Sequence, residues 1–155
     1  MDSTTPEARL AALALEPIAL PVFGSFVAAV RTGDLLHTMG HWPLRGDRPV
    51  TGTVGAEVSL DDARDAARLA ALGLLGTLVA HLGSLDRVRR IATVTVTVNA
   101  TPDFTQHTAV ADAASDLLVD VFGERGHHAR LAVGVSSLPA DLVLELTAVV
   151  QVTEA

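Results

Sequence analysis

The chain has 155 residues, enough for one domain with its own core. Hydrophobic residues make up 49% of it and aromatic residues only 3%; the net charge is −7, and every basic residue is an arginine. Because the chain is acidic and has no basic run, we expect no nucleic-acid partner. The absence of cysteine excludes disulfides and thiolate metal sites. Pro17 and Pro21 break the first apolar stretch well below membrane length, which favours a cytoplasmic protein with no membrane partner.

The first third of the chain is predicted to be only partly regular. Residues 1–22 hold three prolines and little periodicity, so we interpret them as a loose leader before a single domain at 23–155. Strands are predicted at 26–30 and 35–40, with a turn at 31–34 between them. The Gly-, Pro- and Asp-rich stretch at 42–55 is predicted to be an irregular loop.

A long helix is predicted from Ser59 to Gly83. The Ser59 hydroxyl can cap the first amides, the acids that follow suit the positive end of the helix dipole, and Gly83 fits a C-terminal cap. Apolar residues recur between them at helical spacing. Gly73 and Gly76 weaken this helix unless another segment packs closely against them.

The second half alternates strand and helix. Residues 91–99 have a period of two, which predicts a strand, and Thr101-Pro102-Asp103 resembles the entry to a second helix that ends at Gly123. Two closing strands are predicted at 129–136 and 142–152. The order β-β-α-β-α-β-β predicts an α+β fold with one mixed sheet and both helices on a single face.

Strand parity divides the last three strands into two faces. The face predicted to lie under the helices is Val94, Val96, Val98, Leu131, Val133, Val135, Leu142, Leu144 and Leu146. The opposite face is small and lightly charged, which favours burial against identical subunits over an open sheet in a monomer. Arg130 and Glu145 are the charges predicted on it, either as a salt bridge between strands or subunits or as functional groups.

The closing segment resembles the signature of the RidA/YjgF family, the reactive intermediate deaminases. The matching residues are Ala129-Arg130, a short apolar strand, Leu138-Pro139, and Glu145 followed by an apolar strand with Ala148. Val96 to Phe104 resembles the family's strand-to-helix passage ending in Asp-Phe. Phe23 to Phe26, Arg31 to Leu36 and Thr38 to Pro43 resemble its first hairpin more loosely.

The resemblance implies a chorismate-mutase-like fold and a homotrimer with clefts between subunits. Typical members hydrolyse enamine or imine acids to 2-oxo acids and ammonia, as 2-iminobutanoate/2-iminopropanoate deaminases do. It implies that Arg130 grips the substrate carboxylate, as suits a planar guanidinium, while Glu145 and the Ala132 carbonyl hold the attacking water. It further places Phe26, Gly40, His41 and Thr108 at the substrate, with no cofactor.

Several positions depart from the family pattern. Phe26 stands where many deaminating members have tyrosine, Met39 precedes Gly40 where serine is frequent, and the 123–128 connection is longer, as in an atypical longer-loop subgroup. These departures keep two alternatives open: a trimeric small-carboxylate-binding protein without turnover, and a specialised biosynthetic member in which His41 and Trp42 admit a bulkier intermediate.

The six histidines do not predict a metal site. His127 and His128 are adjacent, so on a strand they point to opposite faces, and the other four lack ligand spacing. For His41 the alternative to a substrate contact is a packed or solvated side chain beside Trp42.

Overall fold

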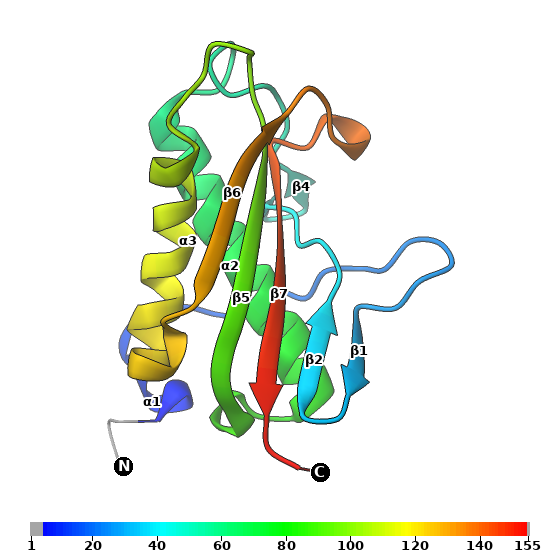
Figure 1. Cartoon of the computed structure of the whole chain (residues 1–155), viewed down its shortest axis with the longest axis vertical. Helices are drawn as coiled ribbons and strands as arrows, with labels where there is room; N and C mark the ends of the chain where they lie inside the picture. The colour runs from blue at the N-terminus through cyan, green and yellow to red at the C-terminus, as the bar shows by residue number, and fades with distance from the viewer. Residues whose placement is uncertain (1–4, 155) are drawn as a thin grey trace.

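The computed structural model describes residues 5–154, which form an α+β fold (Figure 1). In chain order the elements are α1 (Pro6–Ala12), β1 (Ala29–Thr32), β2 (Leu35–Thr38), β3 (Leu44–Arg45), β4 (Arg48–Pro49), α2 (Leu60–Leu82), β5 (Val88–Asn99), α3 (His107–Phe122), β6 (Ala129–Val135) and β7 (Leu144–Val152). Short 3₁₀ turns occupy Leu85–Arg87, Gly123–Gly126 and Pro139–Asp141.

The main sheet is mixed, and its strand order is β1-β2-β7-β5-β6. β5 and β6 pair in parallel, whereas the other neighbours are antiparallel. α2 and α3 pack on one face of this sheet, and the other face is open (Figure 1). The predicted class, element order and single helical face are therefore confirmed. The small β3–β4 hairpin lies within the stretch predicted to be irregular.

α2 is the core helix, and its predicted ends are confirmed. The Ser59 hydroxyl accepts a hydrogen bond from the Asp62 amide at 3.1 Å, and Gly83 ends the helix in the left-handed region at φ 78°. By length and composition alone α2 is apolar enough to cross a membrane, but most of it is buried between the sheet and its neighbours.

The segment before the first strand packs closely against α2. A Cβ at Gly76 would overlap the Ile18 carbonyl, and one at Gly73 would lie 2.8 Å from Cδ1 of Leu20. The Ile18 amide also donates to the Leu72 carbonyl at 3.0 Å. The two glycines thus admit a crossing strand of chain. The expectation of little regular structure in 1–22 is wrong for α1, which packs against α3.

The second helix begins later than the sequence indicates. Residues 101–104 form a turn in which the Phe104 amide donates to the Thr101 carbonyl, while the Thr101 amide is held by Val54. Both amides are therefore engaged outside a helix, and α3 starts only at His107. Its end before Gly123 is as predicted.

The strand parity is confirmed for β5 and β7 but wrong for β6. Val94, Val96, Val98, Leu144 and Leu146 are all buried under the helices. In the β5–β6 register, however, Val94 pairs with Arg130 and Val96 with Ala132. Because paired residues of parallel strands share a face, Arg130, Ala132 and Gly134 lie on the helix side. Leu131, Val133 and Val135 lie on the open face, where Leu131 is 57% exposed.

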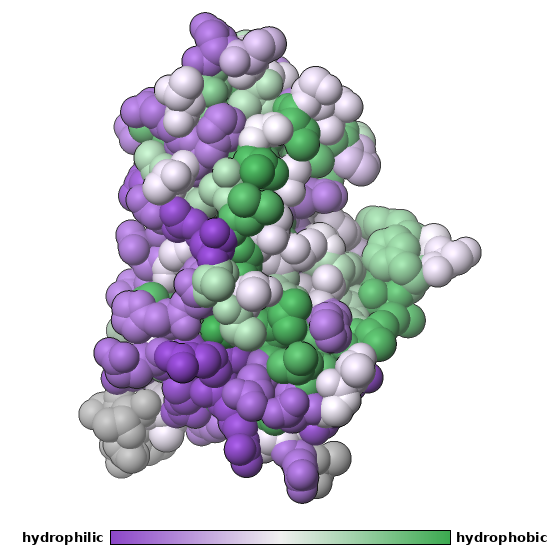
Figure 2. Space-filling model, viewed as in Figure 1, coloured by the Kyte–Doolittle hydropathy of each residue, from purple (hydrophilic) through white to green (hydrophobic). Residues whose placement is uncertain are grey.

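Figure 2 looks onto the open face of the sheet. Apolar residues run along its centre and continue onto the projecting segment before β1, whereas hydrophilic residues gather at the lower end of the molecule (Figure 2). The exposed large apolar side chains of the described residues include Leu131, Val30, Val27, Phe26 and Phe23. An apolar patch of this kind on a sheet is typical of a face that another protein surface covers.

Candidate functional site

One pocket lies beside the open face, at the start of β7. Its volume is about 460 Å³, within the usual range for small-molecule sites. It is walled by the segment before β1, the chain between β2 and β3, the end of β4 and the turn before β7. The lining residues are Phe23, Phe26, Gly40, Trp42, Pro49, Pro139, Ala140, Leu142 and Glu145. We call this the Glu145 pocket.

Glu145 is the charged side chain among the described residues that line this pocket. It follows the first residue of β7 and pairs with Thr97 of β5, which places it on the open face. The side chain is half-buried, and this burial raises the pKa of its carboxyl group above the ordinary value. Gly40 lies against it, since a Cβ at Gly40 would be 3.2 Å from Oε2 of Glu145.

Aromatic rings form the outer wall. The Phe23 and Trp42 rings are tilted by 30° with centroids 6.2 Å apart, a favourable separation for paired rings. Gly24 adopts φ 98°, and the bend at 24–25 brings the Phe26 ring under the same turn, within 3.8 Å of the position a Gly24 Cβ would take. Phe23 and Phe26 are nevertheless 69% and 51% exposed.

His41 does not line the pocket, so the predicted substrate contact is wrong. Its side chain is fully buried between β7 and α2. Nδ1 lies 3.1 Å from the Leu146 carbonyl, which can only accept, so Nδ1 carries the proton and Nε2 accepts from the Thr77 hydroxyl at 2.9 Å. Burial lowers the pKa of His41 to about 4. His41 thereby fixes Gly40 and Trp42, its two neighbours in the pocket wall.

The turn before β7 has an unusual backbone. Ala140 and Asp141 adopt φ 52° and 56°, a left-handed conformation that side chains disfavour. The buried Asn99 amide nitrogen holds this turn by donating to Oδ1 of Asp141 at 3.2 Å and to the Leu142 carbonyl at 3.3 Å. A turn fixed in this way presents Pro139 and Ala140 to the pocket as a rigid wall.

Arg130 lies on the other side of the sheet from Glu145, so the prediction that they share a face is wrong. Its Nη1 atom donates to Oδ1 of Asp112 at 2.8 Å and to Oγ of Ser115 at 3.0 Å, both on α3. The Arg130 side chain is 20% exposed and that of Asp112 is 48% exposed. Within the chain, therefore, Arg130 links β6 to α3.

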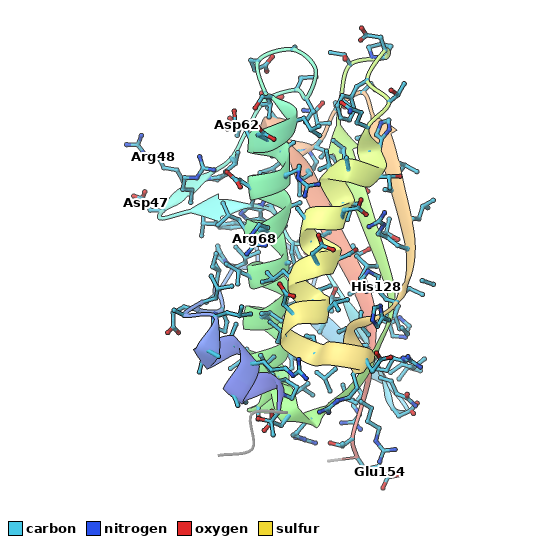
Figure 3. The ribbon with its side chains drawn as sticks, turned by 90° about the vertical axis from the view of Figure 1, so that its left-hand side faces the viewer. Asp47, Arg48, Asp62, Arg68, His128 and Glu154 are labelled. Carbon is cyan, nitrogen blue, oxygen red and sulfur yellow. The ribbon has the colours of Figure 1, made fainter. Side chains whose placement is uncertain are left out.

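Arg130 borders a second hollow of about 680 Å³ between α3 and the start of β6. His128 stands there, where the chain enters β6 (Figure 3). Its Nδ1 donates to the Gly126 carbonyl at 2.6 Å, and its Nε2 lies 2.9 Å from Oγ of Ser115. Burial lowers the pKa of His128, and the nearby Arg130 charge lowers it further. Both Arg130 hydrogen bonds come from Nη1, so among the described residues Nε and Nη2 make none.

The remaining predicted site residues are dispersed. Ala132 is half-buried on the helix side of β6, and Thr108 is exposed in the first turn of α3. The Glu145 pocket therefore unites Phe26, Gly40 and Glu145 from the predicted set, and not Arg130, Ala132, His41 or Thr108. Among the residues that the structure describes, no group of three or more acidic or histidine side chains could hold a metal ion.

The sequence did not single out Phe23 and the turn 139–142 as pocket residues. They are far apart in the chain, and no regular spacing joins them. One compositional signal was available: the chain has four Phe, one Trp and no Tyr, and three of these five aromatic residues line one pocket. Of the others, Phe104 lies near the start of α3 and Phe122 is in the core.

Comparison with known proteins gives a consistent result. The family model described as "YjgF/chorismate mutase-like, putative endoribonuclease" matches residues 7–150. Protein TCP17 of Trypanosoma cruzi is 40% identical over 137 residues, covering 87% of this chain and 86% of the relative.

Two solved structures are similar over nearly their whole length. Protein Atu1372 of Agrobacterium tumefaciens, described as of unknown function, is 35% identical with a TM-score of 0.87, covering 97% of this chain and 96% of its own. A "putative endoribonuclease" of Shewanella oneidensis is 29% identical with a TM-score of 0.91, covering 96% and 99%.

Proposed function

Because the chain belongs to the YjgF/chorismate mutase-like family, we propose that it hydrolyses small carboxylate-bearing imines or enamines to 2-oxo acids and ammonia, with the chemistry in the Glu145 pocket. The observation that carries this proposal is a single half-buried carboxylate in an apolar pocket, with its pKa raised by burial. A raised pKa brings a carboxyl group closer to the range in which it can both take up and release a proton near neutral pH.

In the proposed reaction, Glu145 holds a water molecule against the C=N carbon of the substrate. The substrate enters as the protonated imine, and the carboxylate takes a proton from the water as the water oxygen bonds to carbon, which gives a neutral carbinolamine. Glu145 then returns this proton to the nitrogen, the C–N bond breaks, and ammonia leaves. The hydroxyl becomes the carbonyl by giving its proton to Glu145, which passes it to ammonia or solvent. Water and imine are the sole reactants, so no redox partner is required. The apolar walls exclude competing solvent and strengthen the attraction between the carboxylate and a protonated C=N group.

Arg130 enters this proposal only through a second copy of the chain. Because Arg130 and Glu145 lie on opposite faces of one sheet, one subunit cannot bring them to the same ligand. β6 is an edge strand, and the adjacent open face carries the exposed Leu131. We infer a homotrimer in which the β6 edge of one subunit approaches the Glu145 pocket of the next. The Nε and Nη2 donors of Arg130 would then bind the substrate carboxylate.

The direct test is ammonia release from 2-iminobutanoate produced in situ by a threonine dehydratase. The wild-type chain should accelerate it, and Glu145→Gln should remove most of the acceleration. Arg130→Ala should raise KM more than it lowers kcat if the guanidinium anchors the substrate. An Arg130→Ala rate equal to wild type would remove the anchor but leave the role of Glu145. A Glu145→Gln rate equal to wild type would remove the proposed chemistry.

A second candidate is binding without turnover, favoured by one observation. Phe26 supplies no hydroxyl, and apart from the Trp42 indole N–H the polar group among the described side chains of the pocket wall is Glu145 alone. Melting shifts with 2-oxo acids in the absence of any ammonia release would support this candidate. The net charge of −7 and the lack of a basic run in the sequence favour either small-molecule role over RNA as a substrate.

A further inference from the structure

The walls of the Glu145 pocket contain most of the chain's few aromatic residues. Aromatic residues are 3% of the sequence, yet Phe23, Phe26 and Trp42 meet at this one pocket. None of them is part of the main core, and Phe23 and Phe26 stay more than half exposed. Such exposure of large rings has a solvation cost, and it is relieved when an apolar group enters between them.

We propose that the substrate of this pocket carries an aromatic side chain, and that Phe23, Phe26 and Trp42 select it. The inference rests on the proposed function in taking the pocket for a substrate site, and it names the class of substrate: an imine or enamine acid of phenylalanine-like size. An imine with a methyl or ethyl side chain would leave most of the pocket volume of about 460 Å³ unfilled.

The geometry fits one additional ring. Phe23 and Trp42 are tilted by only 30° at 6.2 Å, so their faces form a shallow wedge to which a third ring can add by offset or edge contact. Pro49, Pro139 and Leu142 supply apolar contact on the other side. Glu145 lies in the pocket wall beside Gly40. If the aromatic rings hold the side chain of the substrate, the C=N carbon of the substrate would therefore face the Glu145 carboxylate.

The expected preference can be estimated from buried area. A phenyl ring offers on the order of 100 Å² more apolar surface than a methyl group, which corresponds to about 50-fold in affinity at the usual coefficient. Incomplete burial of a ring in an open pocket reduces this, so we expect at least about tenfold.

The test uses two non-reacting acids, 3-phenylpropanoate and butanoate, titrated into the wild-type protein by calorimetry. Trp42 is the single tryptophan of the chain, so its fluorescence reports occupancy of this pocket independently. We expect 3-phenylpropanoate to bind at least about tenfold more tightly and to change the Trp42 emission. Equal affinity of the two acids, or tighter binding of butanoate, would overturn the inference.

Variants locate the preference. Phe23→Ala and Phe26→Ala should each weaken the binding of 3-phenylpropanoate by about three- to tenfold and change the affinity for butanoate little. The matched control is Leu13→Ala, which removes another exposed apolar side chain outside the pocket and should alter neither affinity. Equal losses for both acids in the Phe variants would also overturn the inference.

A parallel kinetic arm separates this inference from the proposed function. An L-amino-acid oxidase supplies the imines of phenylalanine and alanine, and ammonia release is followed for both. If neither imine is hydrolysed faster than in buffer, the proposed function fails, while the acid titrations still decide the aromatic preference. If alanine imine is hydrolysed with the higher kcat/KM, the function stands and the aromatic inference fails.

Discussion

Gly40 and Glu145 touch so closely that a single methyl group added at Gly40 would stand 3.2 Å from the Oε2 atom of the carboxylate. Such a contact would be tighter than ordinary van der Waals packing, so the absence of a side chain at Gly40 lets the one charged group among the described pocket residues keep its position. Among the glycines of the described residues, Gly40 is the one at which an added Cβ would meet Glu145.

Gly40→Ala should therefore disturb chemistry more than folding. Its backbone does not require a positive φ, so alanine is allowed there, and the carboxylate must move by a few tenths of an ångström. Misplacement of a reacting group on this scale costs rate steeply, and we expect kcat for imine hydrolysis to fall by about tenfold. The melting temperature, measured on the same sample, should change by less than about 3 °C. A variant with unchanged kcat would show that the position of Glu145 does not matter.

Glu145→Gln should lower the activity but raise the stability at pH 7. Burial raises the pKa of Glu145, so the acid limb of the wild-type pH–rate profile should lie above the ordinary value of 4.5. A raised folded-state pKa means that the group's contribution to stability is complete below its unfolded-state pKa and is lost as pH rises through the folded-state value. At pH 7 the charge is thus a cost, and the glutamine variant should melt about 1–2 °C higher because the group is only half-buried.

That gain should vanish at pH 4, where the wild-type carboxyl is largely protonated. Thermal melts of both proteins at pH 4 and pH 7 check this. A glutamine variant that is equally destabilised at the two pH values would contradict it.

The sequence was most informative where a pattern repeats along one element. Ser59 and Gly83 marked both ends of α2, and alternation placed Val94, Val96 and Val98 under the helices, because capping chemistry and strand period are local properties. For Gly73 and Gly76 the sequence left open whether another segment packs closely against them, and the fold shows that residues 18–20 do.

The sequence failed to predict side-chain orientation in β6, where the orientation depends on which neighbouring elements cover each face of the strand. In β6 the larger apolar residues were assumed to face the helices, yet Arg130 takes that side, where its Nη1 atom donates to Asp112 and Ser115 of α3. Leu131 is left on the open face. Nothing in the period of β6 distinguishes a strand covered by helices from one covered by another subunit.

The same limit applies to the pocket. Glu145, Gly40 and Phe26 were identified through the family resemblance, and they do meet. His41 was misassigned because its neighbours Gly40 and Trp42 both line the pocket, while the strand-like bridge to Leu146 turns the imidazole inward.

Gly76→Ala should destabilise the protein although alanine favours helices. The new Cβ would overlap the backbone carbonyl of Ile18, which cannot move without displacing the segment that crosses α2. We expect a loss of about 2–3 kcal/mol in the free energy of unfolding, of the size seen when a well-packed core is overfilled. Gly73→Ala is the matched control, since its Cβ meets the flexible end of Leu20 and helix propensity offsets most of that contact. Urea titration of both variants decides, and equal losses would contradict the close crossing at Gly76.

His41 should make the protein sensitive to mild acid. Its imidazole is buried and neutral, and burial lowers its pKa from the ordinary value of 6.5 to about 4. For a depressed folded-state pKa, the stabilising contribution is present above the unfolded-state pKa and is lost as pH falls toward the folded-state value. Between pH 7 and pH 5 we therefore expect this one residue to remove about 2 kcal/mol from the free energy of unfolding.

His41→Gln isolates that contribution. The variant should be less stable at pH 7, because it loses the pairing of Thr77 with Leu146 through the ring, but it should lose about 2 kcal/mol less than wild type on acidification to pH 5. His81→Gln, which removes an exposed imidazole from α2, is the control and should retain the wild-type acid sensitivity. Urea unfolding of the three proteins at both pH values provides the measurement. If His41→Gln and wild type lose equal stability between pH 7 and pH 5, the acid sensitivity arises elsewhere and His41 does not hold the wall of the Glu145 pocket as a neutral, buried link.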